Sequence, residues 1–152
     1  VGDGDTLRVQ RQNRTITVRL GCIDAPELAQ RPWGERARDR LRQILPAGQS
    51  VQLREIELDR FGRTVAEVYK ANQSVNLQLV REGHAVVYRQ YLDGCAATQN
   101  QYLQSETTAK QRRLAFWSQT NPTLPWDFRR GGSSLPITRP SPIPSPSPAP
   151  VS

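Results

Sequence analysis

The fold is decided by the stretch Arg19-Leu20-Gly21-Cys22-Ile23-Asp24-Ala25-Pro26-Glu27, which carries one guanidinium group and two carboxylates within nine positions. It completes an alternating run whose apolar residues share one face of a predicted strand, Ile16, Val18 and Leu20. Pro26 cannot donate to a sheet, so the strand ends by Ala25, whose extended conformation leaves its carbonyl able to bind. An acid, a carbonyl and a second acid are donors that a hard cation takes. The same run is also a good strand-to-loop turn, and both interpretations stay open at this point.

The N-terminal residues extend this pattern. Asp3-Gly4-Asp5-Thr6 leads into a short alternating strand, and Gln12-Asn13 provides a turn back to the strand that ends near Leu20. Asp-Gly is an ordinary turn pair by itself. In a hairpin, however, the two strand ends are neighbours, so we expect Asp5 to lie close to Asp24.

The composition favours a polyanionic partner. The chain has 152 residues, 36% of them hydrophobic, with a net charge of +7, a pI near 10.2 and far more Arg than Lys. Guanidinium groups supply bidentate donors for phosphate, so this balance suits a nucleic acid, although it also suits a merely basic surface. No apolar run approaches the length of a membrane span.

Metal chemistry would have to depend on carboxylates. Cys22 and Cys95 are not in metal-binding spacing, and His84 is the only histidine, which we interpret as structural. The remaining hard donors favour calcium or magnesium.

The rest of the chain predicts one folded domain over residues 1–130, with a Pro/Ser-rich disordered tail or linker at 131–152. Residues 133–152 hold 7 of the 12 prolines. The elements expected after Glu27 are a helix at 33–45, strands at 51–56 and 64–69, a helix at 75–82 capped by Ser74, and a helix at about 98–113. This order is compatible with an α+β fold, mainly β: a five-stranded Greek-key barrel of the oligonucleotide-binding (OB) type with three helices.

At this point the chain resembles the staphylococcal (micrococcal, thermo-) nuclease family over residues 1–118. The matching segments are, in order, Asp3-Gly4-Asp5-Thr6, Arg19-Leu20 with Ile23-Asp24-Ala25-Pro26-Glu27, Asp59-Arg60-Phe61-Gly62-Arg63, Leu79-Val80-Arg81-Glu82-Gly83 and Leu114-Ala115-Phe116-Trp117. The family has a strand before the first of these segments. We therefore expect the barrel's first strand to be missing from this chain, and the chain to be a piece of a longer protein.

The resemblance implies a calcium-dependent phosphodiesterase that acts on DNA and RNA with little sequence preference. Carried over by position, it makes Asp5, Asp24 and the Ala25 carbonyl the calcium ligands, with Asp3 beside the metal. Glu27 would activate the attacking water, and Arg19 and Arg63 would hold the scissile phosphate. These roles suit phosphodiester hydrolysis, which places negative charge on the equatorial oxygens and needs a base for water.

The family also places tyrosines along the nucleotide pocket, where Tyr88 and Tyr91 are the candidates and Tyr91 is the better placed. Packing at the barrel edge is the alternative for these two rings. Cys22 and Cys95 either form a disulfide or remain buried thiols. The resemblance, the charge and the cysteines together predict a secreted, periplasmic or cell-envelope protein, acting as a monomer without a stable protein partner.

Two other functions remain open. One is a non-catalytic nucleic-acid-binding OB-fold module, which would keep the fold and lose the chemistry. The other is a protein-interaction module that acts through its Pro-rich tail, although such a tail is more often a spacer.

Overall fold

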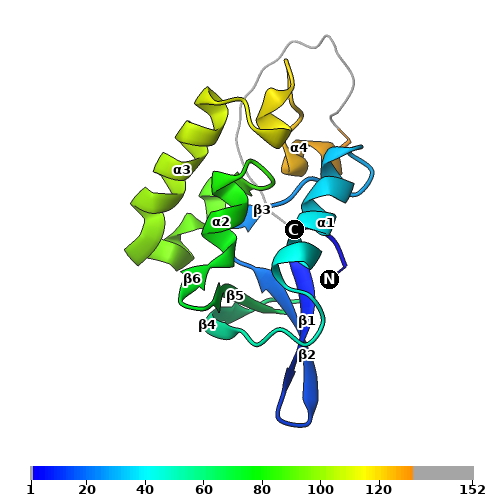
Figure 1. Ribbon diagram of the computed structural model, residues 1–152, viewed down its shortest axis with the longest axis vertical. Helices are drawn as coiled ribbons and strands as arrows, with labels where there is room; N and C mark the ends of the chain where they lie inside the picture. Colours follow the sequence, from blue (N-terminus) through cyan, green and yellow to red (C-terminus); the bar gives the residue numbers. More distant parts are fainter. Residues whose placement is uncertain (1, 132–152) are drawn as a thin grey trace.

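The computed structural model describes residues 2–131. Its N-terminal part is a long hairpin of β1 (Thr6–Arg11) and β2 (Arg14–Leu20), paired from Thr6 opposite Arg19 to Arg11 opposite Arg14. The tip of the hairpin projects away from the helices (Figure 1). The predicted hairpin is therefore confirmed, and its open end lies at the helical side of the molecule.

The main sheet is mixed and open. Its strand order is β1-β2-β5-β4, and β6 pairs with β5 off this path. The other strands of this sheet are β4 (Gln52–Leu58), β5 (Thr64–Lys70) and β6 (Gln73–Ser74). β2 and β5 run parallel, whereas β5 is antiparallel to both β4 and β6. The predicted five-stranded barrel is thus present among the described residues as a five-stranded sheet that does not close, because no ladder joins β1 to β4.

A second, two-stranded sheet begins where β2 ends. The chain turns at Gly21 and Cys22, and Cys22 adopts a left-handed backbone with φ of 68°. The next two residues form β3 (Ile23–Asp24), which pairs antiparallel with β7 (Val86–Val87). This turn directs the acidic end of the stretch away from the main sheet and toward the helices.

The three predicted helices are confirmed as α1 (Trp33–Ile44), α2 (Val75–Arg81) and α3 (Gln99–Gln111). The sequence did not predict the short α4 (Pro125–Arg129). Ser74 caps α2 as predicted, because its hydroxyl accepts from the Leu77 amide at 3.0 Å. Two 3-10 segments complete the order, η1 (Arg89–Thr98) and η2 (Ala115–Ser118). No helix within the described part of the chain is long and apolar enough to cross a membrane.

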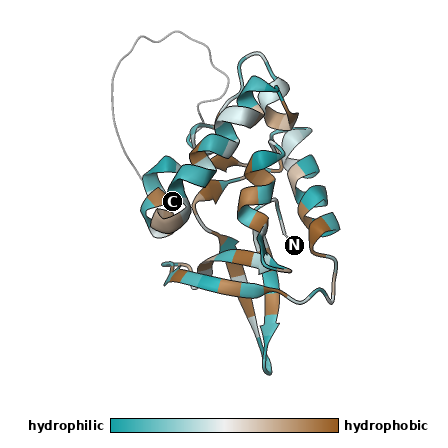
Figure 2. Ribbon diagram, turned by 60° about the vertical axis from the view of Figure 1, so that its left-hand side comes forward, coloured by the Kyte–Doolittle hydropathy of each residue, from teal (hydrophilic) through white to brown (hydrophobic). Residues whose placement is uncertain are grey.

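The core lies between the main sheet and the helices. Apolar positions of the strands and helices face each other there, while the outer faces of the helices are hydrophilic (Figure 2). The largest apolar or aromatic side chains that are fully buried in this layer are Tyr102, Phe116, Leu20, Ile23, Leu41 and Leu79. Leu20 and Ile23 flank the turn at Cys22, so the stretch that carries the acids is anchored in the core on both sides of that turn.

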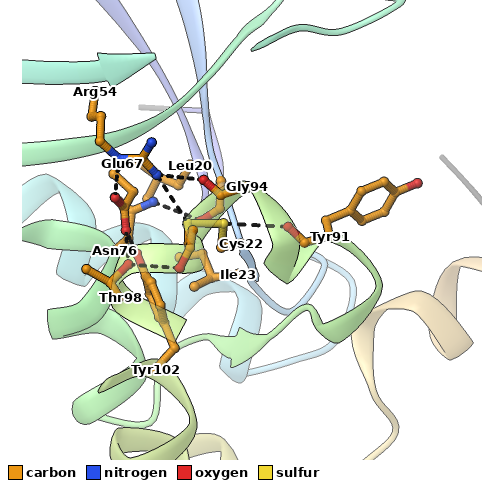
Figure 3. The surroundings of a disulfide bond; sticks show 12 residues. Leu20, Cys22, Ile23, Arg54, Glu67, Asn76, Tyr91, Gly94, Thr98 and Tyr102 are labelled. Carbon is orange, nitrogen blue, oxygen red and sulfur yellow. Dashed lines mark hydrogen bonds and ion pairs between the residues drawn. A yellow bond between two sulfur atoms is a disulfide. The ribbon is translucent and has the colours of Figure 1, made fainter. Parts of the chain in front are cut away.

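A disulfide joins Cys22 to Cys95 across 73 positions of sequence, which settles the alternatives for these cysteines in favour of the bridge. It links the turn before β3 to η1 (Figure 3). The predicted tail at 132–152 lies outside the described residues.

Candidate active site

The two acidic segments predicted to meet do so through backbone contacts. The amide of Leu20 donates to the Asp5 carbonyl at 2.8 Å, and the amide of Ala25 donates to the Asp5 carboxylate at 2.9 Å. Gly4 makes this approach possible, because a Cβ there would lie 2.6 Å from the Ala37 Cβ and 2.8 Å from the Ala25 Cβ. The Asp-Gly-Asp turn is therefore fitted between α1 and the end of β3.

Arg19 lies between the two buried acids. Its Nη2 is 3.7 Å from the Asp5 carboxylate and 3.4 Å from the Asp24 carboxylate. Its Nη1 donates to the carbonyls of Leu20 and Ile23. The two carboxylates thus face one guanidinium group, and the backbone around the turn fixes the orientation of that group.

Glu27 is positioned by a tight loop before α1. Its amide donates to the Gln30 side chain at 2.8 Å, and its carbonyl accepts from the Gln30 amide at 2.8 Å. Gly34 lies directly against this loop, since a Cβ there would be 2.0 Å from the Glu27 carbonyl oxygen. The Glu27 side chain is about one-third exposed, so it is accessible to water while its backbone is held.

Sequence reasoning missed a third arginine at this site. Arg129 of α4 donates to both oxygens of Asp24, at 3.1 and 2.7 Å, and to Glu27 at 2.8 Å. One nitrogen, Nη1, therefore lies within 3.1 Å of both carboxylates, which places Glu27 beside Asp24. Pro125 at the first helical position is a sequence signal for the start of α4. Nothing in the sequence pairs Arg129 with acids about a hundred positions away.

Arg63 is close to the same strand but has its own partner. Thr64 pairs with Val18 of β2. Arg63 is the residue before Thr64, so it lies beside the position of β2 that is two residues before Arg19. Its Nε donates to Asp59 at 2.8 Å, and its guanidinium carbon lies 5.6 Å from the exposed Phe61 ring. The structure thus brings Asp5, Arg19, Asp24 and Glu27 into one connected group, while Arg63 is paired within the β4–β5 turn.

The two tyrosines lie next to this group. Tyr88 and Tyr91 contact each other edge to face, with ring centroids 4.8 Å apart. The Tyr88 ring is almost fully buried and stacks on Trp126 of α4, whereas Tyr91 is 42% exposed. Tyr91 is therefore the more accessible ring.

Burial dominates the electrostatics of the acids. It raises the pKa of Asp24 to about 7, with the Asp5 charge adding to the effect and Arg129 and Arg19 opposing it. Burial likewise raises the pKa of Asp3 to about 6, helped by Asp5. Burial also works to raise the pKa of Asp5, but Arg19 and the Ala25 amide hold it below its ordinary value. A cation among these groups would favour their ionised forms.

The donor chemistry fits a hard divalent cation. The two buried carboxylates and the carbonyl of Ala25 are oxygen donors of the type that Ca²⁺ and Mg²⁺ take. In the described part of the chain, no three or more His, Cys, Asp or Glu side chains are grouped so as to hold a metal. The protein would thus provide part of a coordination shell and water the rest. The Arg129 guanidinium group forms ion pairs with both Asp24 and Glu27.

A protein family and several individual proteins with names of nucleases or endonucleases are similar to this chain. The family of staphylococcal nuclease homologues matches residues 17–119. A micrococcal nuclease of Shigella flexneri is 40% identical over 141 residues, covering 87% of this chain and 78% of that protein. An uncharacterized endonuclease of Haemophilus influenzae is 35% identical over 131 residues, covering 86% and 70%. A probable staphylococcal-like nuclease of Oryza sativa subsp. japonica is 33% identical over 117 residues, covering 77% of this chain and 29% of that protein.

Fold and site together define a small α+β protein whose buried acids are interleaved with guanidinium groups. The chain belongs to the staphylococcal nuclease family, as the resemblance predicted. Membership of this family supports the OB-type classification of the sheet and a nuclease function.

Proposed function

We propose that this protein is a calcium-dependent phosphodiesterase, an endonuclease that hydrolyses DNA and RNA with little sequence preference. The observation that carries the proposal is the convergence of Asp5, Asp24 and Glu27 on shared guanidinium nitrogens. The relatives named micrococcal nuclease and endonuclease support the same activity. The net charge of +7 favours encounter with a polyanionic substrate.

Asp5, Asp24 and the Ala25 carbonyl would hold Ca²⁺. When bound, the ion would polarise the scissile phosphate and stabilise the negative charge that develops on it. The protein's own share is to hold two carboxylates in a buried position where a cation can compensate the cost of their desolvation.

Glu27 would act as the general base. Of the three acids it is the one with a substantially exposed carboxylate, while its backbone is fixed by Gln30 and by the close approach of Gly34. A carboxylate that is held firmly yet open to solvent can orient a water molecule and take its proton at one oxygen.

Arg19 and Arg63 would bind the phosphate. Arg19 is preorganised by two backbone carbonyls and lies beside both acids. Arg63 is held by Asp59 next to the same strand, and from there its guanidinium group would donate to the same phosphate. Tyr91, and Tyr88 once uncovered, would offer rings for a base to stack on.

The disulfide supports export to an oxidising compartment, whether outside the cell or in the periplasm and envelope, because such bonds persist there. We propose that the protein acts there as a monomer on nucleic acid.

The test compares cleavage of plasmid DNA and of RNA in calcium and in excess chelator, using wild type, Glu27→Gln and Glu35→Gln. Glu35 is a matched control, because it lies in the first turn of α1 and pairs with Arg31 on the surface. We expect calcium-dependent cleavage that Glu27→Gln lowers by roughly 10²–10⁴-fold and Glu35→Gln leaves unchanged. Binding of nucleic acid in calcium without any cleavage would instead identify a non-catalytic binding module.

A further inference from the structure

Arg129 pairs with Asp24, one of the two carboxylates proposed to hold the cation. Its guanidinium group spans Asp24 with two hydrogen bonds of 3.1 and 2.7 Å and reaches Glu27 at 2.8 Å. Asp24 is a proposed metal ligand and Glu27 the proposed base. One side chain from the C-terminal part of the domain therefore engages both functions at once.

Trp126, three positions earlier on the same helix, covers the predicted nucleotide pocket. Its ring lies parallel to the Tyr88 ring, with an interplanar angle of 9° and centroids 5.0 Å apart. This is the face-to-face arrangement that a nucleic-acid base would adopt on Tyr88. Arg129 also lies 3.5 Å from the Tyr88 hydroxyl, so the two α4 side chains enclose this tyrosine.

The helix that carries both residues is short and is held by the site itself. α4 has five residues, too few to form a stable helix alone in water. Its leading segment is tied to the Glu27 loop through the Gln30 side chain, which donates to the Thr123 carbonyl at 2.7 Å. In Figure 1, α4 lies beside the N-terminal end of α1, where that loop enters. No α4 residue belongs to the hydrophobic core cluster, so its displacement would leave the sheet and that cluster in place.

We propose that α4 is an autoinhibitory segment, in which Arg129 occupies the Asp24 carboxylate that calcium would bind and Trp126 takes the place of a base on Tyr88. This inference rests on the proposed function. Because the guanidinium group and the cation compete for the Asp24 carboxylate, calcium binds to molecules whose α4 has moved away. The apparent affinity for calcium is then reduced by the fraction of molecules in the open state. The site stays closed at low calcium and opens as calcium and nucleic acid replace the two side chains.

The first experiment titrates calcium into the full metal-free chain by calorimetry, without nucleic acid, for wild type, Arg129→Ala, Trp126→Ala and Arg130→Ala. Arg130 is the matched control for charge, because it follows Arg129 directly, is two-thirds exposed and pairs with Asp127 of its own helix. We expect Arg129→Ala and Trp126→Ala to bind calcium about tenfold more tightly than wild type. Trp126→Ala removes no charge, so a gain there reports release of α4 rather than lower electrostatic repulsion.

The second measurement follows the tryptophan indole N–H signals of the wild-type protein by NMR as calcium is added. Trp126→Phe assigns the relevant signal. We expect the Trp126 signal to move toward that of an exposed indole, while the signal of Trp117, which packs at η2, stays in place.

The outcomes separate the two proposals. Calcium-dependent cleavage by wild type, with no gain in calcium affinity in either α4 variant or a stationary Trp126 signal, overturns the autoinhibitory role alone. No calcium binding and no cleavage in any of the proteins overturns the proposed function and this inference with it.

Discussion

Asp24 and Glu67 are both fully buried carboxylates, but their partners differ in kind. Glu67 accepts hydrogen bonds from Arg54 at 2.7 Å and from the hydroxyl groups of Thr98 and Tyr102 (Figure 3). The Tyr69 hydroxyl is a third hydroxyl donor to the same carboxylate. Asp24 has side-chain donors from two guanidinium groups, Arg19 and Arg129, and another buried acid nearby. The donors to Glu67 are mainly neutral hydroxyl groups, whereas the side-chain donors to Asp24 are charged guanidinium groups.

The difference fits a structural role for Glu67 and the proposed cation-binding role for Asp24. The donors of Glu67 come from β4, β5, η1 and α3, so this carboxylate ties four segments together beside the disulfide. Glu106 also joins separate segments, since it accepts from the Val87 amide of β7 at 2.7 Å and from Arg89 of η1. Asp24 has a pKa raised to about 7 by burial despite its arginines, so its charge is incompletely compensated and a further cation would be favourable.

Replacement of Asp24 by its amide should therefore lower activity, whereas replacement of Glu67 by its amide should lower stability. Asp24→Asn removes a proposed cation ligand, and we expect calcium-dependent cleavage to fall by roughly 10²–10³-fold. The melting temperature without calcium should be unchanged or higher, because the neutral amide avoids the cost of a buried charge. Cleavage assays and thermal melts of the same preparation measure both effects. Loss of folding in this variant would place Asp24 with the structural acids.

Glu67→Gln should lower stability and leave activity unchanged. An amide presents one oxygen and an NH₂ group to four donors, which leaves buried hydroxyl groups and Arg54 without an acceptor. We expect a loss of about 2–3 kcal/mol in the free energy of unfolding, measured by urea denaturation with the disulfide intact. The activity per folded molecule should stay at the wild-type value. A variant that melts normally but cleaves poorly would contradict the structural assignment of Glu67.

Local sequence patterns predicted most elements of the fold. Periodicity located the hairpin and three helices, and Ser74 marked the start of α2 because a hydroxyl cap acts over three positions. The neighbour relation between Asp5 and Asp24 also followed, since antiparallel pairing places the two ends of a hairpin together. These features depend on residues that are close in sequence or joined by one hairpin.

The features that the sequence did not predict depend on long-range docking. Arg129 meets Asp24 across 105 positions, and α4 is too short for its period to be visible. Glu67 lies in an alternating strand, where nothing indicates that both faces are covered. The barrel was expected with its first strand missing, and in the described residues the ladders end at β1 and β4 without closing. Such contacts are decided by packing between elements, not by the pattern within one.

A close backbone approach further distinguishes Glu27, the proposed base, from Glu67. Gly34→Ala would bring a methyl group 2.0 Å from the Glu27 carbonyl oxygen, so the loop that holds Glu27 must shift. We expect kcat to fall by roughly tenfold, since small displacements of a catalytic group are costly. Gly2→Ala is the control, because a Cβ there has no atom within 4 Å. Equal kcat values in the two variants would show that the position of Glu27 does not depend on α1.

The smallest expected effect is the difference in stability between losing the Tyr102 hydroxyl and losing the Tyr69 hydroxyl, both donors to Glu67. Tyr102 is buried and donates at 2.6 Å, whereas Tyr69 donates at 3.4 Å from a partly exposed position. Tyr102→Phe should lower the free energy of unfolding by about 1 kcal/mol, the net value of a buried hydrogen bond. Tyr69→Phe removes the same hydroxyl group at the longer distance and should change the stability by less than half as much. Urea denaturation of both variants beside wild type measures the contrast. Equal losses would mean that the Glu67 cluster is stabilised by its total number of donors and not by the buried bond from α3 to β5.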